Sequence, residues 1–281
     1  MSDAPQTPQD QAAYWNDDGG RRWVENIERV ERMLRPLSDH LLRAAAPAAG
    51  EHVLDVGCGG GTTSAALAEA VGTSGQVLGA DVSAVILDIA KRRYGARANL
   101  AFTLGDCAAL PFPPARFDLL ASRFGVMFFP DPGGAFTHLR KAVKRGGRLA
   151  FLCWRALDMN PWMSVPAEAA FKILPRPEPQ PPHAPGPFAF ADGTRLRAVL
   201  EGADWRDVRI EGIDVLLDLG DPAEAVQQLV RMGPPAPSFA AAAPETRAEV
   251  LAAVARAFAP HVVNGRITLP GATWVVQASA G

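Results

Sequence analysis

The feature that most constrains this chain is a glycine-rich turn at residues 57–61, which reads GCGGG. An apolar stretch, HVLDV, precedes the turn, and a run rich in helix formers, TTSAALAEA, follows it. Each glycine costs conformational entropy that a larger residue would not, so the turn must need bare backbone. The N-terminus of a helix also offers unpaired N–H groups and partial positive charge. The pattern therefore predicts a strand, a tight turn and a helix that bind a ligand at their junction.

Strands and helices alternate along most of the chain. The pattern predicts strands at residues 52–57, 75–81, 99–106, 117–124, 148–154, 205–219 and 272–280. It predicts helices at 20–46, 62–71, 83–94, 132–147, 193–203, 222–232 and 245–259. Pro36 marks a kink or a break in the first of these helices. The alternation indicates βαβ units and a doubly wound, mainly parallel sheet.

Three acidic residues close successive predicted strands: Asp55, Asp81 and Asp106. Because open α/β sheets bind ligands at the carboxyl ends of their strands, we expect the three side chains to share one site. Asp81 lies 24 residues after Gly57, a spacing at which a carboxylate accepts both hydroxyls of a ribose. A ligand with an amino-acid end, a ribose and an adenine would meet all three acids. Each acid taken singly could merely cap the helix that follows it.

These motifs resemble those of a known family. The stretches VLDVGCGGG, GADVS, GDCAALPF and RFDLLASRFGVMFF resemble the successive motifs of class I S-adenosylmethionine-dependent methyltransferases. The resemblance covers roughly residues 50–154, with a weaker match through GADWRDVRI and the final strand. The whole chain is similar to the small-molecule subgroup related to the quinone-biosynthesis methyltransferases. The family's usual turn is GCGTG, so Gly60 is a mild departure that leaves the backbone path open.

The resemblance implies a fold and a division of the chain. The fold is α/β, with a doubly wound, seven-stranded, mainly parallel, Rossmann-like sheet. A helical N-terminal lid and inserted segments that cap the substrate site are added to it. Residues 1–13 would be a disordered lead, 14–48 the lid, and 49–281 the methyltransferase domain, with cap insertions at about 158–190 and 220–268.

The resemblance also implies contacts to S-adenosyl-L-methionine, position by position. The methionine part would lie against the turn, the ribose on the acid of the second strand, and the adenine between the second and third strand ends. The implied contacts are, in that order, Asp55, Gly57, Cys58, Gly59 and Gly61; Asp81; and Val82, Asp106, Cys107 and Ala108. Ser122 and Arg123, which close the fourth strand, would face the methionine end and the substrate. Tyr14 and Trp15 would belong to the lid, whereas Trp23 would anchor its helix to the core.

The resemblance further implies transfer of the cofactor's methyl group to a small, apolar or aromatic metabolite. The sulfonium makes the methyl group electrophilic, so in-line positioning of a nucleophile is the main requirement. No catalytic residue is assigned, because His138 lies within a predicted helix and is more simply a packing residue. An apolar set after the fifth predicted strand suits an aromatic or lipid-like substrate, and core packing explains it equally well: Trp154, Met159, Trp162 and Met163.

Three alternatives stay open on the residues alone. A nicotinamide-dependent oxidoreductase could use a similar sheet, but Thr62 occupies the third glycine position of its fingerprint and Asp55 would repel a pyrophosphate. A nucleic-acid methyltransferase is disfavoured by the sequence ASRF at the fourth strand end and by a net charge of −2. A cofactor-binding protein without catalysis is the third alternative, and only a turnover assay separates it from an enzyme.

Composition favours a cytoplasmic protein. The chain has 48% hydrophobic and 21% charged residues, no apolar run long enough to span a membrane, and no secretion signal at its N-terminus. Cys58, Cys107 and Cys153 are too few and too widely spaced for a disulfide framework or a zinc site. We therefore expect reduced thiols and no metal. The oligomeric state is left open by the sequence, a homodimer included.

Overall fold

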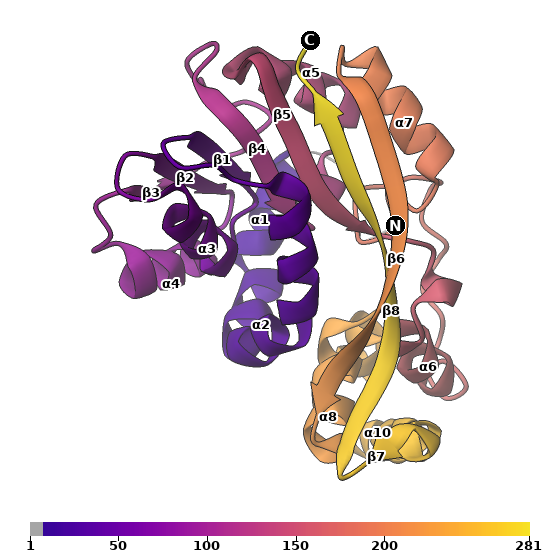
Figure 1. Cartoon of the computed structure of the whole chain (residues 1–281). Coiled ribbons are helices and arrows are strands. Elements are labelled where there is room, and N and C mark those ends of the chain that lie inside the picture. Colours follow the sequence, from indigo (N-terminus) through magenta and orange to yellow (C-terminus); the bar gives the residue numbers. More distant parts are fainter. Residues whose placement is uncertain (1–7) are drawn as a thin grey trace.

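The computed structural model describes residues 8–281, with side chains from Gln11 onward, and centres on one eight-stranded sheet. Its strands are β1 (His52–Val56), β2 (Gln76–Asp81), β3 (Leu100–Leu104), β4 (Phe117–Arg123), β5 (Val143–Trp154), β6 (Arg206–Gly220), β7 (Val262–Val263) and β8 (Arg266–Ser279). They lie in the order β3-β2-β1-β4-β5-β8-β6, with β7 beside β8 (Figure 1). Strands β1 to β5 pair in parallel, and β8 is antiparallel to β5, β6 and β7. The predicted doubly wound, mainly parallel sheet is confirmed, with the two-residue β7 added to the seven expected strands.

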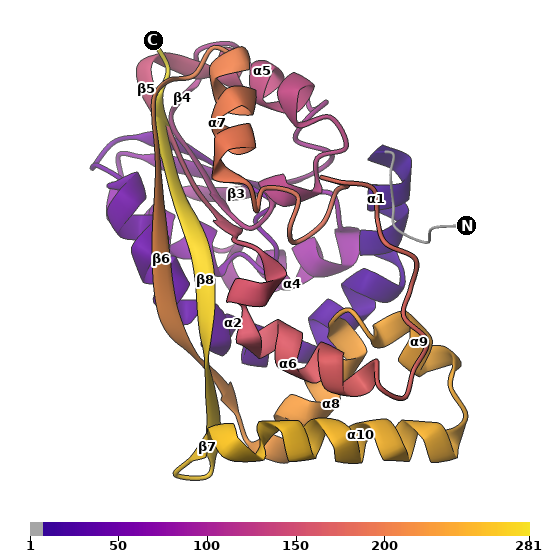
Figure 2. The same ribbon diagram turned by 90° about the vertical axis from the view of Figure 1, so that its right-hand side faces the viewer.

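Helices cover both faces of this sheet. They are α1 (Pro8–Asn16), α2 (Asp18–Ala45), α3 (Thr62–Val71), α4 (Ala84–Tyr94), α5 (Pro132–Ala142), α6 (Pro161–Ala170), α7 (Gly193–Gly202), α8 (Pro222–Met232), α9 (Ala236–Ala241) and α10 (Pro244–Phe258). Helix α2 contacts both α3 and α4 on one face, and α5 packs with α7 on the other (Figure 2). Helices α6, α8, α9 and α10, here called the cap, pack together beside the far end of the long β6–β8 hairpin (Figure 1). None of the described helices is both long and apolar enough to cross a membrane.

The order of the strands places a ligand crevice at the end of β1. The chain winds outward from β1 through β2 and β3, and then returns to β4 on the other side of β1. In open α/β sheets such a reversal leaves a crevice at the carboxyl ends of the two central strands. Leu119, Leu120 and Ala121 of β4 are fully buried, as expected for a parallel strand covered on both faces. The core therefore fixes β1 and β4, and the turns that follow them meet in the crevice.

The N-terminal segment differs from its prediction. Residues 8–13, expected to be disordered, form most of α1, and residues 1–7 of that lead lie outside the described residues. Helix α2 is one helix through Pro36, without the break that the proline could have caused. Leu37 and Leu41 are fully buried just beyond the proline. Their packing on the sheet offsets the hydrogen bond that Pro36 cannot donate.

Two other boundaries differ from the prediction. Residues 143–147, expected to end a helix, begin strand β5, where Val143 pairs with Phe117 of β4 through a register irregularity. Gly146 has a φ of +74° within this stretch, and in the sequence it resembles the glycine that ends a helix. Helix α6 has no counterpart among the predicted helices, because Pro161 and Pro166 disguise its apolar pattern.

Candidate functional site

The glycine turn joins β1 to α3 and presents open backbone. Gly57 has a φ of +66°, and a Cβ there would lie 2.7 Å from the Cα of Gly125, so a side chain would drive β1 and β4 apart. Gly59 has a φ of +54°, and a Cβ there would meet no atom closer than 4.0 Å. The turn is held by the N–H groups of Gly57 and Cys58, which donate to the carbonyl of Ala80 at 2.9 and 3.1 Å. Gly57 therefore serves close packing, and the backbone at Gly59 is free to approach a ligand.

Asp55, the acid that precedes this turn, has an incomplete set of partners. Its side chain is fully buried, and its Oδ2 accepts a hydrogen bond from the Ser64 hydroxyl at 2.6 Å. Its Oδ1 is also buried and has no hydrogen-bond partner. Burial raises the pKa of Asp55 to about 7, against the Ser64 hydrogen bond and the charge of Arg123, which lower it. A buried acceptor without a donor is costly, so Oδ1 fits a site that a ligand's donor completes.

Asp55 lines a cavity of about 50 Å³ between the turn, the end of β4 and helix α2. The lining residues are Trp23, Glu31, Leu34, Asp55, Gly57, Cys58, Gly59, Gly60, Thr63, Arg123 and Phe124. A volume of this size holds a few water molecules or the charged end of a ligand. Of the predicted site residues, the cavity brings together Asp55, Arg123 and the first half of the turn. Gly61 faces away from it, against Ala90 of α4 and Phe102 of β3.

Arg123, at the end of β4, makes a buried ion pair with helix α2. Its guanidinium donates to Glu31 Oε2 at 2.8 Å and to the Ser38 hydroxyl at 2.7 Å. The two charged side chains are only 9% and 12% exposed, so water screens their attraction weakly. Arg123 therefore lines the cavity, while its hydrogen bonds to Glu31 and Ser38 hold α2 on the sheet, and its predicted contact with the cofactor stays a prediction.

Ser122 lies behind the cavity wall and does not line it. Its hydroxyl donates to the carbonyl of Val56 at 2.7 Å and accepts from the N–H of Gly125 at 3.2 Å. The residue is fully buried. Its hydroxyl therefore ties the end of β1 to the turn after β4, and the expected direct contact of this side chain with a ligand has no support in the geometry.

Asp81, at the end of β2, supports the turn from below. Its two carboxylate oxygens accept from the N–H groups of Gly59 at 2.8 Å and of Ser83 at 2.9 Å. Burial raises the pKa of Asp81 against these hydrogen bonds. A carboxylate oxygen accepts more than one hydrogen bond, so both oxygens retain capacity for a ligand's hydroxyls.

Helix α1 is fastened to the corner between β2 and α4. The Ser83 hydroxyl donates to the carbonyl of Trp15 at 2.5 Å. The Asn16 amide donates to the carbonyl of Val82 at 2.9 Å and accepts from the N–H of Ala84 at 2.8 Å. The predicted lid residue Trp15 and the predicted adenine contact Val82 therefore lie in neighbouring segments.

Asp106 follows β3, the edge strand beside β2. Its Oδ1 accepts from the N–H of Ala108 at 2.9 Å, and its carbonyl accepts from Ala109 and Leu110, so it caps the turn after the strand. Cys107 is buried with its Sγ 3.8 Å from the carbonyl of Ala80, and burial raises the pKa of its thiol. The acids of β1, β2 and β3 thus close three adjacent strands, as the sequence predicts.

The aromatic residues of the N-terminal segment lie in different surroundings. Trp23 packs against the core, as predicted, and also lines the cavity. Tyr14 is 41% exposed and is not among the residues that line the cavity. Trp15 packs edge-on against Tyr14, Trp23 and Phe128, with ring centroids 5.3, 6.0 and 5.2 Å away. Of the two N-terminal helices, α2 is the one that lines the cavity, and Tyr14 and Trp15 stay a prediction as lid residues.

Besides Trp23, five residues that line the cavity are absent from the predicted site: Glu31, Leu34, Gly60, Thr63 and Phe124. Glu31 and Ser38 are seven residues apart on α2, which is two helical turns, and this spacing is the signal that could have paired them with one partner. Phe124 carries no periodic signal, because it follows the last residue of a strand. His138, by contrast, is a packing residue as expected: its Nε2 is 2.8 Å from the carbonyl of Leu110 and its ring lies near Phe112.

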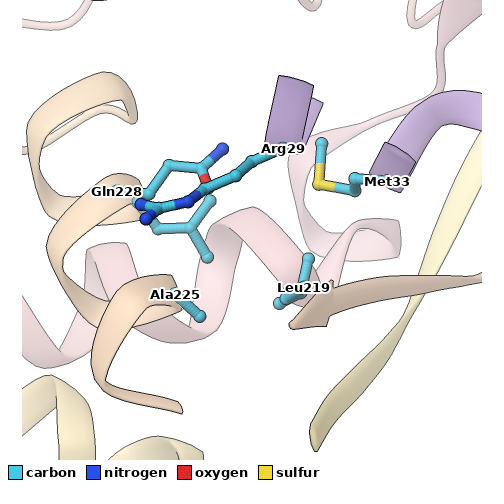
Figure 3. A pocket seen from close by; sticks show the side chains of 6 residues that line it. Arg29, Met33, Leu219, Ala225 and Gln228 are labelled. Carbon is cyan, nitrogen blue, oxygen red and sulfur yellow. The ribbon is translucent and has the colours of Figure 1, made fainter. Parts of the chain in front are cut away.

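A second, smaller cavity lies between α2, α8 and the end of β6 (Figure 3). Its volume is about 10 Å³, roughly the space that one water molecule needs. Arg29 of α2 extends across it and pairs with Glu224 of α8 at 2.9 Å. The lining residues are Arg29, Met33, Leu219, Ala225, Gln228 and Leu229. This cavity marks the contact between α2 and the cap.

Comparison with known proteins identifies a domain and its relatives. Residues 53–147 match the family model described as a methyltransferase domain. The chain is 34% identical over 118 residues to aklanonic acid methyltransferase of Streptomyces sp. (strain C5). This alignment covers 41% of this chain and 54% of that protein. It is 37% identical over 114 residues to a ubiquinone/menaquinone biosynthesis C-methyltransferase of Cellvibrio japonicus, covering 40% and 46%. The chain thus spans about half the length of the curated relatives it matches.

Solved structures share the fold at low sequence identity. Phosphoethanolamine N-methyltransferase 2 of Haemonchus contortus, in complex with S-adenosyl-L-methionine, has a TM-score of 0.61 at 15% identity, covering 96% of this chain and 59% of that one. The YcgJ protein of Bacillus subtilis has a TM-score of 0.55 at 18% identity, covering 87% and 98%. Residues 53–147 are therefore similar to a methyltransferase domain, and the chain as a whole shares the fold of these solved structures.

Proposed function

We propose that this protein transfers a methyl group from S-adenosyl-L-methionine to a small molecule. The observation that carries the proposal is Asp55, whose buried oxygen without a partner belongs to a cavity beneath the open backbone of the glycine turn. A ligand end with a positive charge and an N–H donor satisfies this oxygen. The relatives named above are methyltransferases, which supports the same ligand.

The residues at the strand ends fit this ligand along its length. Asp55 and Arg123 offer opposite charges to the ammonium and the carboxylate of its methionine part. Gly59 offers open backbone, and Asp81 retains acceptor capacity for the ribose hydroxyls. Asp106 would accept from the adenine amino group at the end of β3. When bound, the sulfonium supplies an electrophilic methyl group.

The chain's own contribution is orientation and the exclusion of water. Trp23, Leu34 and Phe124 give the cavity apolar walls, so a nucleophile placed there loses its water shell. Holding the nucleophile in line removes much of the entropic barrier. No side chain is assigned as a base, since Glu31 is paired with Arg123 and His138 is bonded elsewhere.

The acceptor we propose is a small, apolar or aromatic metabolite, and the setting is the cytoplasm. Aklanonic acid and the quinones appear in the names of two relatives, and aromatic rings line the cavity of this chain. The net charge of −2 favours such an acceptor over a nucleic acid. Cys58, Cys107 and Cys153 are buried free thiols, which suits a reducing compartment. A homodimer is compatible with all of these observations.

Two measurements test the proposed function. In thermal-shift and calorimetric titrations we expect S-adenosylhomocysteine to bind and stabilise the full chain and NAD to have no effect. Stabilisation by NAD alone would reassign the sheet to a nicotinamide-dependent oxidoreductase. An assay coupled to release of S-adenosylhomocysteine, run across quinols, phenols, amines and thiols, then tests turnover. Cofactor binding without turnover of any acceptor would favour a cofactor-binding protein without catalysis.

A further inference from the structure

An aromatic stack borders the cavity at the ends of β4 and β5. Phe124 directly follows β4, and Trp154 is the last residue of β5. Their ring centroids are 4.3 Å apart with an interplanar angle of 7°, and Trp162 of α6 lies 5.0 Å from Trp154. All three rings are buried. Of the three, Phe124 is the one that lines the cavity, and its ring is stacked on Trp154.

The backbone of Phe124 is strained to place this ring. Its φ is +67°, in the left-handed region that residues with a side chain seldom adopt. Glycine or asparagine would fit this backbone better. Strained conformations persist where the surrounding structure enforces them, and they concentrate at binding sites. Here the conformation stacks the ring on Trp154 and puts it in the wall of the cavity that contains Asp55.

We propose that Phe124, backed by Trp154, is the face on which a planar aromatic acceptor stacks during methyl transfer, and that it selects such acceptors over saturated ones. The proposal rests on the proposed function and specifies its acceptor. The cavity is lined by the charged residues Glu31, Asp55 and Arg123 and by the apolar residues Trp23, Leu34 and Phe124. The charged residues fit the methionine end of the cofactor, and the apolar residues fit an acceptor. Stacking on a ring favours a flat π system over a saturated ring of the same size.

Access to Phe124 depends on helix α2. The cavity of about 50 Å³ is smaller than an aromatic acceptor, and Trp23, Glu31 and Leu34 of α2 form the wall shared with Phe124. Trp154 pairs with Thr273 of β8, and the N–H of Phe124, just after β4, donates to the carbonyl of Leu152 in β5 at 3.1 Å, so the sheet fixes both residues. An acceptor therefore reaches Phe124 when α2 moves outward, while the stacking face itself stays in place.

Binding of 2-naphthol and of decahydro-2-naphthol tests the proposal, because the two alcohols share a carbon skeleton and differ in planarity. Both are titrated calorimetrically into the full chain saturated with S-adenosylhomocysteine. We expect 2-naphthol to bind about fivefold more tightly, the size of preference that a pair of stacked rings produces. Phe124→Leu should abolish this preference. Phe124→Tyr, which retains a ring, should keep it.

A matched control removes a ring elsewhere. Phe190 is buried against Phe136 and Phe151 and does not line the cavity, so Phe190→Leu should keep the preference. Phe124→Leu should bind S-adenosylmethionine and S-adenosylhomocysteine within about twofold of the wild type, which also shows that it is folded. If Phe124→Leu does not fold, Phe124→Met, which has a flexible side chain and no ring, is used in the same titrations.

The outcomes separate this proposal from the proposed function. A preference for 2-naphthol that survives in Phe124→Leu, or that the wild type lacks, overturns the assignment of the stacking face. A variant that loses affinity for S-adenosylmethionine but not for S-adenosylhomocysteine also overturns it, because the ring would then serve the sulfonium. A wild-type protein that binds neither cofactor form overturns the proposed function instead.

Discussion

Replacing Asp55 by asparagine should separate the stability of this protein from its ability to bind a cofactor. Burial raises the pKa of Asp55 to about 7 in the folded chain, and 3.8 is the ordinary value that the unfolded chain keeps. Below pH 3.8 the Asp55 carboxyl is protonated in both the folded and the unfolded chain, so it makes no contribution to the change of stability with pH. As the pH rises from there to 7, the unfolded state loses its proton first, so stability falls. At 1.36 kcal/mol per pKa unit, the loss approaches about 4 kcal/mol above pH 7.

Asparagine has nearly the same shape and does not ionise. We expect the free energy of unfolding of Asp55→Asn, relative to wild type, to rise by about 2.5 kcal/mol between pH 5 and pH 8. Urea titrations of the ligand-free proteins measure the free energy of unfolding. Subtracting the wild-type value from that of the variant removes the contribution of the other carboxyls, because both proteins contain them. Asp88→Asn, an exposed change on α4, is the control and should show no trend. If the difference in unfolding free energy between Asp55→Asn and wild type did not change with pH, the reasoning would be refuted, because Asp55 would then not be a neutral buried carboxyl at pH 5.

The same carboxyl predicts the opposite trend for the ligand. If the ligand's cation pairs with the charged form, the share of that form rises from about 9% at pH 6 to about 91% at pH 8. The affinity of wild type for S-adenosylhomocysteine should therefore rise about tenfold over this interval. Asp55→Asn should bind at least about tenfold more weakly at pH 8 and show no such rise. Tighter binding by wild type at pH 6 than at pH 8, measured by calorimetry, would contradict the pairing.

Three further perturbations test the contacts around the cavity. Asp81→Ala should weaken S-adenosylmethionine binding at least about tenfold by calorimetry, because a hydrogen-bonded carboxylate is lost; unchanged affinity would reject the ribose assignment. Glu31→Gln should lower the free energy of unfolding, measured by urea titration, by about 3 kcal/mol, since it leaves Arg123 buried without a counter-charge. Adding Arg123→Met should recover part of that loss, and a double variant whose loss equals the sum of the two single losses would refute the coupling of the two residues. Asn16→Ala should speed cofactor release several-fold in stopped-flow measurements, whereas Asn26→Ala, which removes a bond within α2 only, should not; equal rates would show that α1 does not retain the cofactor.

The sequence predicted the strand ends well, because their positions follow from local pattern and one rule of topology. Asp55, Asp81 and Asp106 close consecutive strands, and parallel strands that lie side by side must bring such residues to one edge. The glycine turn is equally local, since its conformation is set by residues adjacent in the chain. The pattern alone indicates only that the ligand is a nucleoside with an amino-acid end. The identity of the ligand came from the resemblance to a known family.

The residues whose place the sequence did not predict are positioned by packing between elements that are far apart in the chain. Glu31, Leu34 and Trp23 reach the cavity because α2 crosses the crevice at a particular height, which no periodicity in α2 reveals. Strand β5 begins at Val143 because β4 is available to pair with it, and that competition is invisible in a segment that otherwise looks helical. Phe124 stacks on Trp154, a residue 30 positions away in the chain, so local pattern does not reveal its positive φ.

Helix α2 contacts the cavity and the cap at the same time. Glu31 and Trp23 line the cavity, whereas Arg29 pairs with Glu224 of α8 and Met33 lines the smaller cavity between α2 and α8 (Figure 3). The outward movement of α2 proposed above for acceptor binding therefore changes the contact between α2 and α8 as well. Acceptor binding at Phe124 and the position of the cap are then coupled, and thermodynamic reciprocity requires the coupling free energy to be the same in both directions.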